Sequence, residues 1–301
     1  MIAVYWMVGT LLSFSLMAIG VRELGGSISP FEMLFFRSLI GLAVIVSIVF
    51  YHRQQRLLKT ERVALQFGRN LMNFLGQYCW FLGITLLPLA EVFALEFTVP
   101  LWTLMIACVF LGEKLTKVKI VSLGLGLLGV IAIIQPTAAV FNPASLIVLL
   151  AAVSFAASYV ATKSLSLTES PITILFYMSL LQLPISLVLM LPDWQTPQGV
   201  EWLYLLIVGL TGLSAHYCIA KAMQYADASV VVTLDFLRLP LIAVVGMLFY
   251  GEAVEVAVML GGLLMVVGNI LNVRRAGKCN VELQTTSWTS FKLKRFLRSG
   301  R

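Results

Sequence analysis

Ten long apolar stretches run along the chain and limit its fold more than any other feature. An α-helix needs about 20 mostly apolar residues to cross the hydrocarbon core of a bilayer, and each stretch is close to that length. Of the 301 residues, 60% are hydrophobic and 12% are charged, against about 25% charged in a soluble domain. The sequence therefore predicts an all-α polytopic membrane protein and excludes an ordinary water-soluble enzyme. The ten expected transmembrane helices cover approximately residues 2–21, 31–51, 64–86, 88–111, 118–135, 143–163, 171–191, 201–221, 226–250 and 253–273.

The distribution of Lys and Arg predicts how these helices are oriented. If the N-terminus is cytoplasmic, 17 of the 21 basic residues lie in cytoplasmic loops or in the C-terminal segment, and only Arg22 lies in an outer loop. Cytoplasmic loops of membrane proteins carry an excess of Lys and Arg. We therefore expect a multi-pass protein of the cell (inner) membrane with both termini in the cytoplasm. The other three basic residues, Arg37, Arg69 and Arg238, fall within expected helices.

A shift of the chain by 139 residues reveals an internal repeat, which aligns Glu96 with Asp235 and Phe97 with Phe236. Each half then has five helices, and because five is odd the second half must run opposite to the first. Inverted repeats of this kind are typical of secondary transporters, which bind their substrate near the midplane between the halves. The expected domains are a first five-helix repeat at 1–136, an inverted five-helix repeat at 137–273 and a cytoplasmic basic tail at 274–301.

Two acidic residues lie deep within expected helices. At about 1.5 Å per residue, Glu96 and Asp235 lie about 12 Å and about 13 Å from the nearest helix ends. A charged side chain is costly in hydrocarbon and is a functional candidate by default. We interpret the pair as two carboxylates that face one cavity and bind a cationic group or carry a proton. The alternative is structural pairing with a buried arginine, because Arg238 follows Asp235 by three residues and lies on the same helical face.

Arg37 lies about 10 Å into the second expected helix. It either holds a substrate carboxylate or pairs with Glu32 or Glu96 for structural reasons. Together with Arg238, it is therefore a candidate for carboxylate binding or for charge balance.

The third expected helix carries polar residues at every fourth position, namely Arg69, Asn73 and Gln77, so these share one face. Such a face turns toward protein or water rather than lipid, and it either contacts substrate or bonds neighbouring helices. Arg69 lies near the cytoplasmic end, where its side chain can also snorkel toward water. The polar substrate contacts that we expect are Asn73, Gln77, His216, Tyr78 and Tyr217, of which Gln77 aligns with His216 and Tyr78 with Tyr217 in the repeat.

Aromatic residues in the expected helices offer rings that stack on a substrate ring or meet a cation, and their alternative role is packing or interfacial anchoring. They are Trp6, Phe14, Trp80, Phe81, Phe93, Phe97, Trp102, Phe155 and Tyr159. No ATP-binding motif and no cluster of metal ligands occurs, so neither a cofactor nor a metal is expected. The glycines at positions 124, 126 and 129 match a GxGxxG pattern but follow no strand, so we expect them to permit close helix packing.

Several short motifs occur in order along residues 1–273, namely Pro30-Phe31-Glu32, Phe35-Phe36-Arg37, Leu87-Pro88-Leu89-Ala90, Phe97-Thr98-Val99-Pro100-Leu101, Leu111-Gly112-Glu113-Lys114, Gly129-Val130, Gln135-Pro136, Lys221-Ala222, Asp227-Ala228 and Gly251-Glu252. In their order and spacing they resemble the EamA family of the drug/metabolite transporter superfamily. The resemblance implies ten helices in two inverted repeats around a central cavity, and movement of small metabolites without ATP hydrolysis. Other segments, which include Phe141-Asn142-Pro143 and Leu175-Phe176-Tyr177, resemble the S-adenosylmethionine transporters of intracellular bacteria within this family.

These observations predict a secondary active transporter that moves a small polar or zwitterionic metabolite, such as S-adenosylmethionine or a related amino-acid derivative, by alternating access. Export of amino acids, riboflavin or a metallophore is the alternative within the same family. From other classes, a membrane-embedded lipid-modifying enzyme and a channel stay open, although a chain with two histidines offers few catalytic groups. The expected partners are a small-molecule substrate and the lipid bilayer, with a homodimer as an open alternative and no nucleic acid.

Overall fold

A computed structural model describes residues 2–25, 27–87, 92, 95–134, 143–250, 256 and 259–271. Within these ranges the chain is all-helical and contains no strand. The expected tail at 274–301, the first residues of the expected span 88–111 and most of 251–258 lie outside the described residues.

The helices follow the expected apolar stretches, and five of them are long and apolar enough to cross a membrane. These five begin at residues 2, 30, 144, 171 and 201, while two shorter helices, Val99–Phe110 and Met259–Leu271, are also apolar. The elements are α1 (Ile2–Leu24), α2 (Pro30–Tyr51), η1 (Gln55–Leu58), α3 (Val63–Leu86), α5 (Val99–Phe110), α6 (Lys117–Ile134), α7 (Pro143–Ser166), α8 (Pro171–Met190), η2 (Leu191–Asp193), α9 (Glu201–Tyr225), α10 (Ala228–Leu234), η3 (Asp235–Leu237) and α11 (Arg238–Tyr250).

Two helices at corresponding places in the halves begin with the same local chemistry. Ser29 precedes Pro30 at the start of α2, and its side chain accepts a hydrogen bond from the backbone N–H of Glu32 at 3.3 Å. Ser170 precedes Pro171 at the start of α8 and accepts from the N–H of Ile172, also at 3.3 Å. Serine satisfies a free N–H at a helix start, and proline suits the first helical turn because it needs no donor there.

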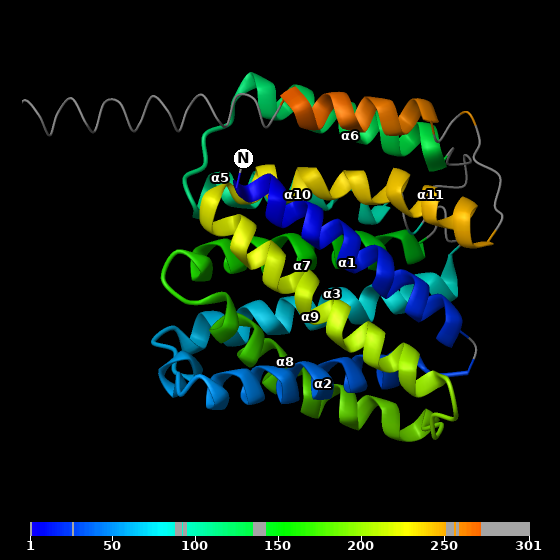
Figure 1. Ribbon diagram of the computed structural model, residues 1–301. Helices are drawn as coiled ribbons and strands as arrows, with labels where there is room; N and C mark the ends of the chain where they lie inside the picture. The colour runs from blue at the N-terminus through cyan, green and yellow to red at the C-terminus, as the bar shows by residue number, and fades with distance from the viewer. Residues whose placement is uncertain are drawn as a thin grey trace, which may run out of the picture.

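The most extensive helix contacts join the two halves of the chain. α1 packs along α9, α3 packs along α7, and α2 packs along α8. The first and third helices of one half thus pair with the third and first helices of the other, which is the pattern expected of two halves related by a two-fold exchange. Figure 1 shows α1 and α9 lying side by side across the bundle, and the final helix lying along α6 at its edge.

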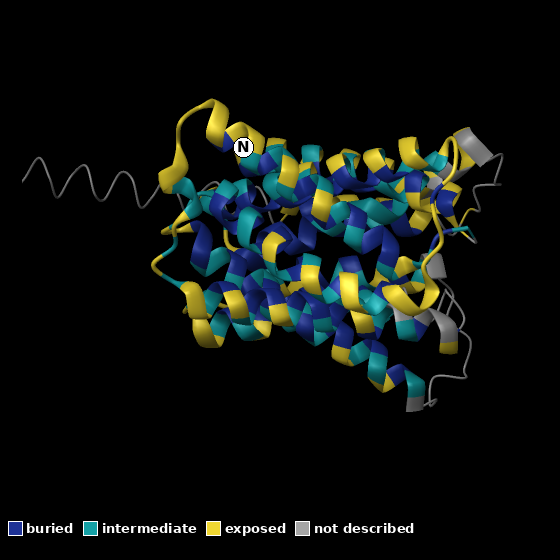
Figure 2. Cartoon of the chain, turned by 90° about the horizontal axis from the view of Figure 1, so that it is seen from below, coloured by how far each residue is buried: buried dark blue, intermediate teal, exposed yellow. Residues whose placement is uncertain are grey.

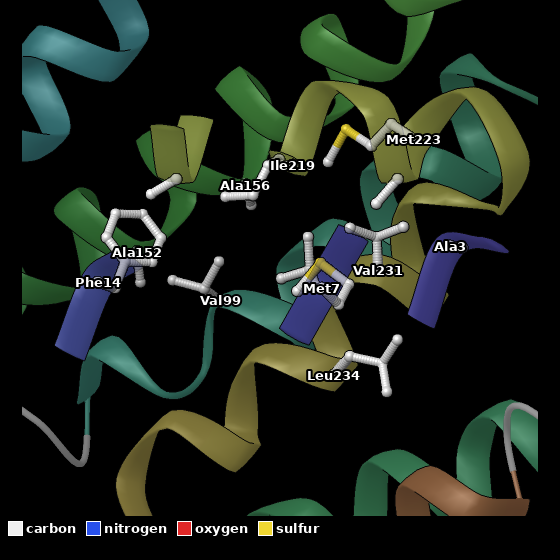
Figure 3. Packing of buried hydrophobic residues seen from close by; sticks show 13 residues of the cluster. Ala3, Met7, Phe14, Val99, Ala152, Ala156, Ile219, Met223, Val231 and Leu234 are labelled. Atoms are coloured by element: carbon white, nitrogen blue, oxygen red, sulfur yellow. The ribbon is translucent and has the colours of Figure 1, made fainter. Parts of the chain in front are cut away.

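Burial separates an apolar interior from an apolar outer surface. Exposed residues lie on the outside of the bundle and buried ones lie between the helices (Figure 2). One interior cluster draws side chains from α1, α5, α7, α9 and α10, so it fastens both halves together (Figure 3). Its labelled members are Ala3, Met7, Phe14, Val99, Ala152, Ala156, Ile219, Met223, Val231 and Leu234.

Two expected helices are interrupted rather than continuous. The expected span 226–250 is divided into α10, the short 3-10 turn η3 and α11, and a turn at residues 97–98 precedes α5. Prolines explain both breaks, because Pro100 and Pro240 cannot donate to the carbonyl four residues earlier and their rings clash with it. Hydropathy reports apolar length and does not detect such a break, so the sequence predicted unbroken helices here.

The halves are also joined by polar contacts at the end of the bundle that carries the Lys-rich loops. Glu113 Oε1 accepts a hydrogen bond from the backbone N–H of Ala228 at 2.7 Å and so caps the start of α10. Lys119 Nζ lies 3.0 Å from Glu113 Oε2 and 2.7 Å from Asp227 Oδ2. The hydroxyl of Ser229 also donates to Glu113. A carboxylate is well suited to this position because a helix N-terminus carries partial positive charge.

Candidate functional site

A cavity of about 200 Å³ lies among α1, α2, α3, α5, α7, α9 and the interrupted helix that contains η3. Residues from both halves of the chain line it, as expected for a site between inverted repeats. Seven of the nine predicted site residues are among them, namely Arg37, Asn73, Gln77, Glu96, His216, Asp235 and Arg238. The predicted aromatic residues Phe14, Trp80, Phe97, Phe155 and Tyr159 also line it.

The two repeat-related carboxylates meet at one guanidinium. Nη2 of Arg238 lies 3.1 Å from Oε1 of Glu96 and 3.2 Å from Oδ2 of Asp235. Glu96 Oε2 also accepts a hydrogen bond from the indole N–H of Trp80 at 2.7 Å. Oδ1 of Asp235 is buried and has no hydrogen-bond partner among the described residues. This group of three charges carries a net charge of −1 when all are ionised, and it keeps one carboxylate oxygen for a further partner.

Both carboxylates sit at the helix interruptions. Glu96 directly precedes the turn at residues 97–98, and Asp235 begins η3. Thr98 shapes the first turn, because its hydroxyl donates to the carbonyl of Leu95 at 2.6 Å and accepts from the indole N–H of Trp102 at 3.2 Å. Interrupted helices at mid-membrane depth are a recurring way in which transporters build substrate and ion sites.

Aromatic rings surround the guanidinium of Arg238. Its carbon lies 5.4 Å from the centre of the Phe14 ring and 5.7 Å from that of Phe97. Phe97 in turn stacks on its repeat equivalent Phe236, with ring centres 5.9 Å apart. These distances suit cation–π attraction, so the same wall accepts a cation from the protein or from a ligand.

Arg37 has a different environment from the one the sequence suggested. It pairs with neither Glu32 nor Glu96. Its Nη2 instead donates a hydrogen bond to Oε1 of Gln182 at 3.2 Å. Glu32 is fully buried, and its Oε2 accepts from the backbone N–H of Gln195 at 3.2 Å. Glu96 is occupied by Arg238. Among the residues that the structure describes, Arg37 has no carboxylate within ion-pair distance.

The polar face of α3 divides between cavity lining and helix bonding. Asn73 Nδ2 donates to the Ser158 hydroxyl at 3.3 Å, and its Oδ1 accepts from Gln182 at 2.9 Å. Arg69 is 3% exposed rather than extended toward water, and its Nε donates to the hydroxyl of Thr162 at 3.0 Å. Snorkeling is therefore wrong for Arg69, whose guanidinium bonds α7 instead.

Three of the remaining predicted contacts differ in their relation to the cavity. His216 is buried and lines it, and its ring meets Phe14 edge-on with centres 5.7 Å apart. Tyr78 and Tyr217 are not among the lining residues. Tyr78 is 43% exposed and stacks on Phe31, while Tyr217 packs edge-on against Trp6. Their helical phase is the reason, since each follows a lining residue and points away from the cavity.

Gln182 on α8 does not line the cavity but bonds to two residues that do, and it was not among the residues predicted from the sequence. It is 2% exposed and links Arg37 of α2 to Asn73 of α3. A glutamine in the middle of the mostly apolar span 171–191 is the signal that could have identified it, because such a residue needs a partner in hydrocarbon.

Comparison with known proteins gives a consistent result across the chain. The sequence model of the EamA-like transporter family matches residues 1–135 and 142–274. An S-adenosylmethionine uptake transporter of Rickettsia felis is 30% identical over 87% of this chain and 88% of its own length. A riboflavin transporter of Vibrio cholerae is 35% identical over 64% of this chain and 66% of its own, and a pseudopaline exporter of Pseudomonas aeruginosa is 28% identical over 86% and 91%.

A solved crystal structure of another protein has the same fold. The two superpose with a TM-score of 0.79 at 19% sequence identity, covering 92% of this chain and 98% of the other. At this identity the likeness concerns the fold alone.

Proposed function

This chain belongs to the EamA-like transporter family of the drug/metabolite transporter superfamily, and from that premise we propose that it is a secondary active carrier of a small zwitterionic metabolite. It is a multi-pass membrane transporter rather than an enzyme, because the family and the curated relatives are transporters. In our proposal ten spans cross the inner membrane, with both termini in the cytoplasm. The two halves rock around the cavity and expose it to each side in turn.

The observation that carries this proposal is the pair Glu96 and Asp235. The two residues are equivalent in the repeat, both sit at helix interruptions, and both line one cavity that the two halves share. Carboxylates in a membrane interior are retained only where they are paired or used. Here one arginine serves both, so the group has a surplus negative charge for a cationic group or a proton.

S-adenosylmethionine is the cargo we favour, on two grounds. The relative from Rickettsia felis is an S-adenosylmethionine uptake transporter and aligns with most of the chain. The cargo also matches the cavity, since its sulfonium and ammonium suit the surplus carboxylate and its adenine suits rings such as Phe14 and Phe97. The alternative within the family is export of an amino acid, riboflavin or a metallophore, which the other relatives support.

Exchange of radiolabelled S-adenosylmethionine in proteoliposomes tests the proposal. We expect saturable counterflow that unlabelled S-adenosylmethionine inhibits and riboflavin does not. Glu96→Gln is expected to reduce exchange at least about tenfold, the value of a charge-assisted contact of about 1.5 kcal/mol. Glu61→Gln is the matched control because Glu61 is exposed outside the cavity. If the wild-type protein exchanges no S-adenosylmethionine, the assignment of this cargo is wrong. If Glu96→Gln exchanges it normally, the assignment of Glu96 to the binding site is wrong.

A further inference from the structure

Arg37 is a half-buried cation of the cavity that has no carboxylate partner among the described residues. It lines the same cavity as Glu96 and Asp235, yet both of those carboxylates are engaged by Arg238. Within the described part of the chain, its one side-chain hydrogen bond goes to the neutral side chain of Gln182. A guanidinium has five N–H donors, so most of its donors are unused by the described residues. An uncompensated charge away from water is costly, so the positive charge of Arg37 calls for a counter-charge that the described residues do not supply.

The side chain of Arg37 is held in place by the fold. A Cβ atom at Gly212 on α9 would lie 2.9 Å from Cδ of Arg37, so the glycine makes room for the arginine stem. Gln182 fixes the other end and is itself fixed by Asn73, at 2.9 Å. Three helices thus position one guanidinium at the cavity wall. A preorganised group of this kind binds a ligand without the entropic cost of ordering it.

Two further polar side chains of the cavity have no hydrogen-bond partner among the residues that the structure describes. Oε1 of Gln77 is buried and unbonded, and the amide makes no hydrogen bond to any described residue. His216 is 8% exposed, lines the cavity and makes only an edge contact with Phe14 among the described residues. An amide and an imidazole each offer an N–H donor, and buried polar groups are normally satisfied. Both groups line the cavity, so their N–H donors are available to a ligand there.

We infer that Arg37, with Gln77 and His216, forms a carboxylate-binding subsite, and that the cargo is therefore bound as an amino-acid zwitterion in one orientation. Its carboxylate lies on Arg37, which forms bidentate bonds with planar anions. Its cationic groups lie at Glu96 and Asp235, where no described residue bonds to Oδ1 of Asp235. Arg238 is excluded as the carboxylate ligand because the two acids already share it. This inference rests on the proposed function and adds a requirement for a carboxylate in the cargo.

Competition in the counterflow assay tests the subsite. Decarboxylated S-adenosylmethionine keeps the sulfonium, the amine and the adenine and lacks only the carboxylate. We expect it to inhibit wild-type exchange about 10- to 100-fold less well than S-adenosylmethionine, as for loss of a hydrogen-bonded charge pair. In Arg37→Gln the two compounds should inhibit within about threefold of each other. Arg37→Lys should recover part of the preference for the carboxylate-containing compound, because lysine supplies the positive charge but not the two parallel N–H donors of a guanidinium.

Two further variants keep the inference falsifiable if Arg37→Gln does not fold. Gly212→Ala leaves the charge in place but crowds the stem of Arg37, so it should weaken the preference for the carboxylate. Arg56→Gln removes an exposed loop arginine and should behave as wild type. An unchanged preference in Arg37→Gln or Gly212→Ala, or equal inhibition of the wild type by both compounds, overturns the subsite and leaves the transporter proposal standing. Absence of any exchange by the wild type overturns the proposed cargo and the subsite together.

Discussion

Nη2 of Arg238 lies 3.1 Å from Oε1 of Glu96, so one ion pair joins two residues that are 142 positions apart in the chain. The same atom lies 3.2 Å from Oδ2 of Asp235, which is three residues earlier in the chain, at the start of η3. The local pair was predictable from spacing, whereas the pair with Glu96 exists because the interrupted helices of the two halves meet. Arg238 therefore couples the cavity chemistry to the association of the halves.

Arg238→Gln should destabilise the protein as well as impair exchange. Removal of one member of a buried ion pair costs about 3–5 kcal/mol, and the lower end applies here because these side chains keep 15–22% exposure. Adding Asp235→Asn should recover about 1–2 kcal/mol by removing one of the two opposed carboxylates. Thermal unfolding in detergent measures both effects. Purely additive losses in the double variant would contradict the shared ion pair.

Gly126 and Gly124 on α6 provide a matched test of helix packing. A Cβ at Gly126 would lie 2.3 Å from the ring of Phe236, which is fully buried and lines the cavity, whereas a Cβ at Gly124 meets nothing within 4 Å. We expect Gly126→Ala to lower the free energy of unfolding by about 1–3 kcal/mol. Gly124→Ala should be neutral or stabilising by up to about 1 kcal/mol, because alanine favours helix. Equal melting temperatures would contradict the close approach.

Lys119 is expected to stabilise the contact between the halves at the end with the Lys-rich loops. Its side chain is 10% exposed and bridges Glu113 and Asp227. Lys119→Met should lower the free energy of unfolding by about 1–3 kcal/mol, because it leaves the buried Glu113 carboxylate without its cation. Lys114→Met is the control, since Lys114 is exposed. If both variants melt at the same temperature, the bridge makes no net contribution.

Labelling of single cysteines tests the proposed orientation. Arg56 and Gln195 are both exposed, and they lie in the α2–α3 and α8–α9 connections, at opposite ends of the helices. In a background without the four native cysteines, a membrane-impermeant maleimide added to intact cells should label Gln195→Cys and spare Arg56→Cys. Permeabilised cells should label both. The reverse pattern in intact cells would place the termini outside and overturn the assignment from Lys and Arg.

The residues of the candidate site were predictable where a charged side chain stands out in an apolar stretch. Glu96, Asp235 and Arg238 are conspicuous because charge is rare in these apolar stretches, and all three line the cavity. The repeat also indicated that the two acids are related. The tyrosines at 78 and 217 were predicted on the same alignment, yet repeat equivalence specifies only that two residues share an environment, not that the environment is the cavity.

The sequence by itself determined the all-helical membrane character, because a continuous apolar stretch of about 20 residues crosses a bilayer as a helix that satisfies its own backbone. Only the tertiary structure decided which groups meet. The pairing of Arg37 with Gln182 rather than with Glu32 or Glu96 depends on how α2, α3 and α8 pack, over a separation of 145 residues. Hydropathy is a local property that depends on neighbours along the chain, whereas an ion pair, or a hydrogen-bond donor without an acceptor, depends on neighbours in space.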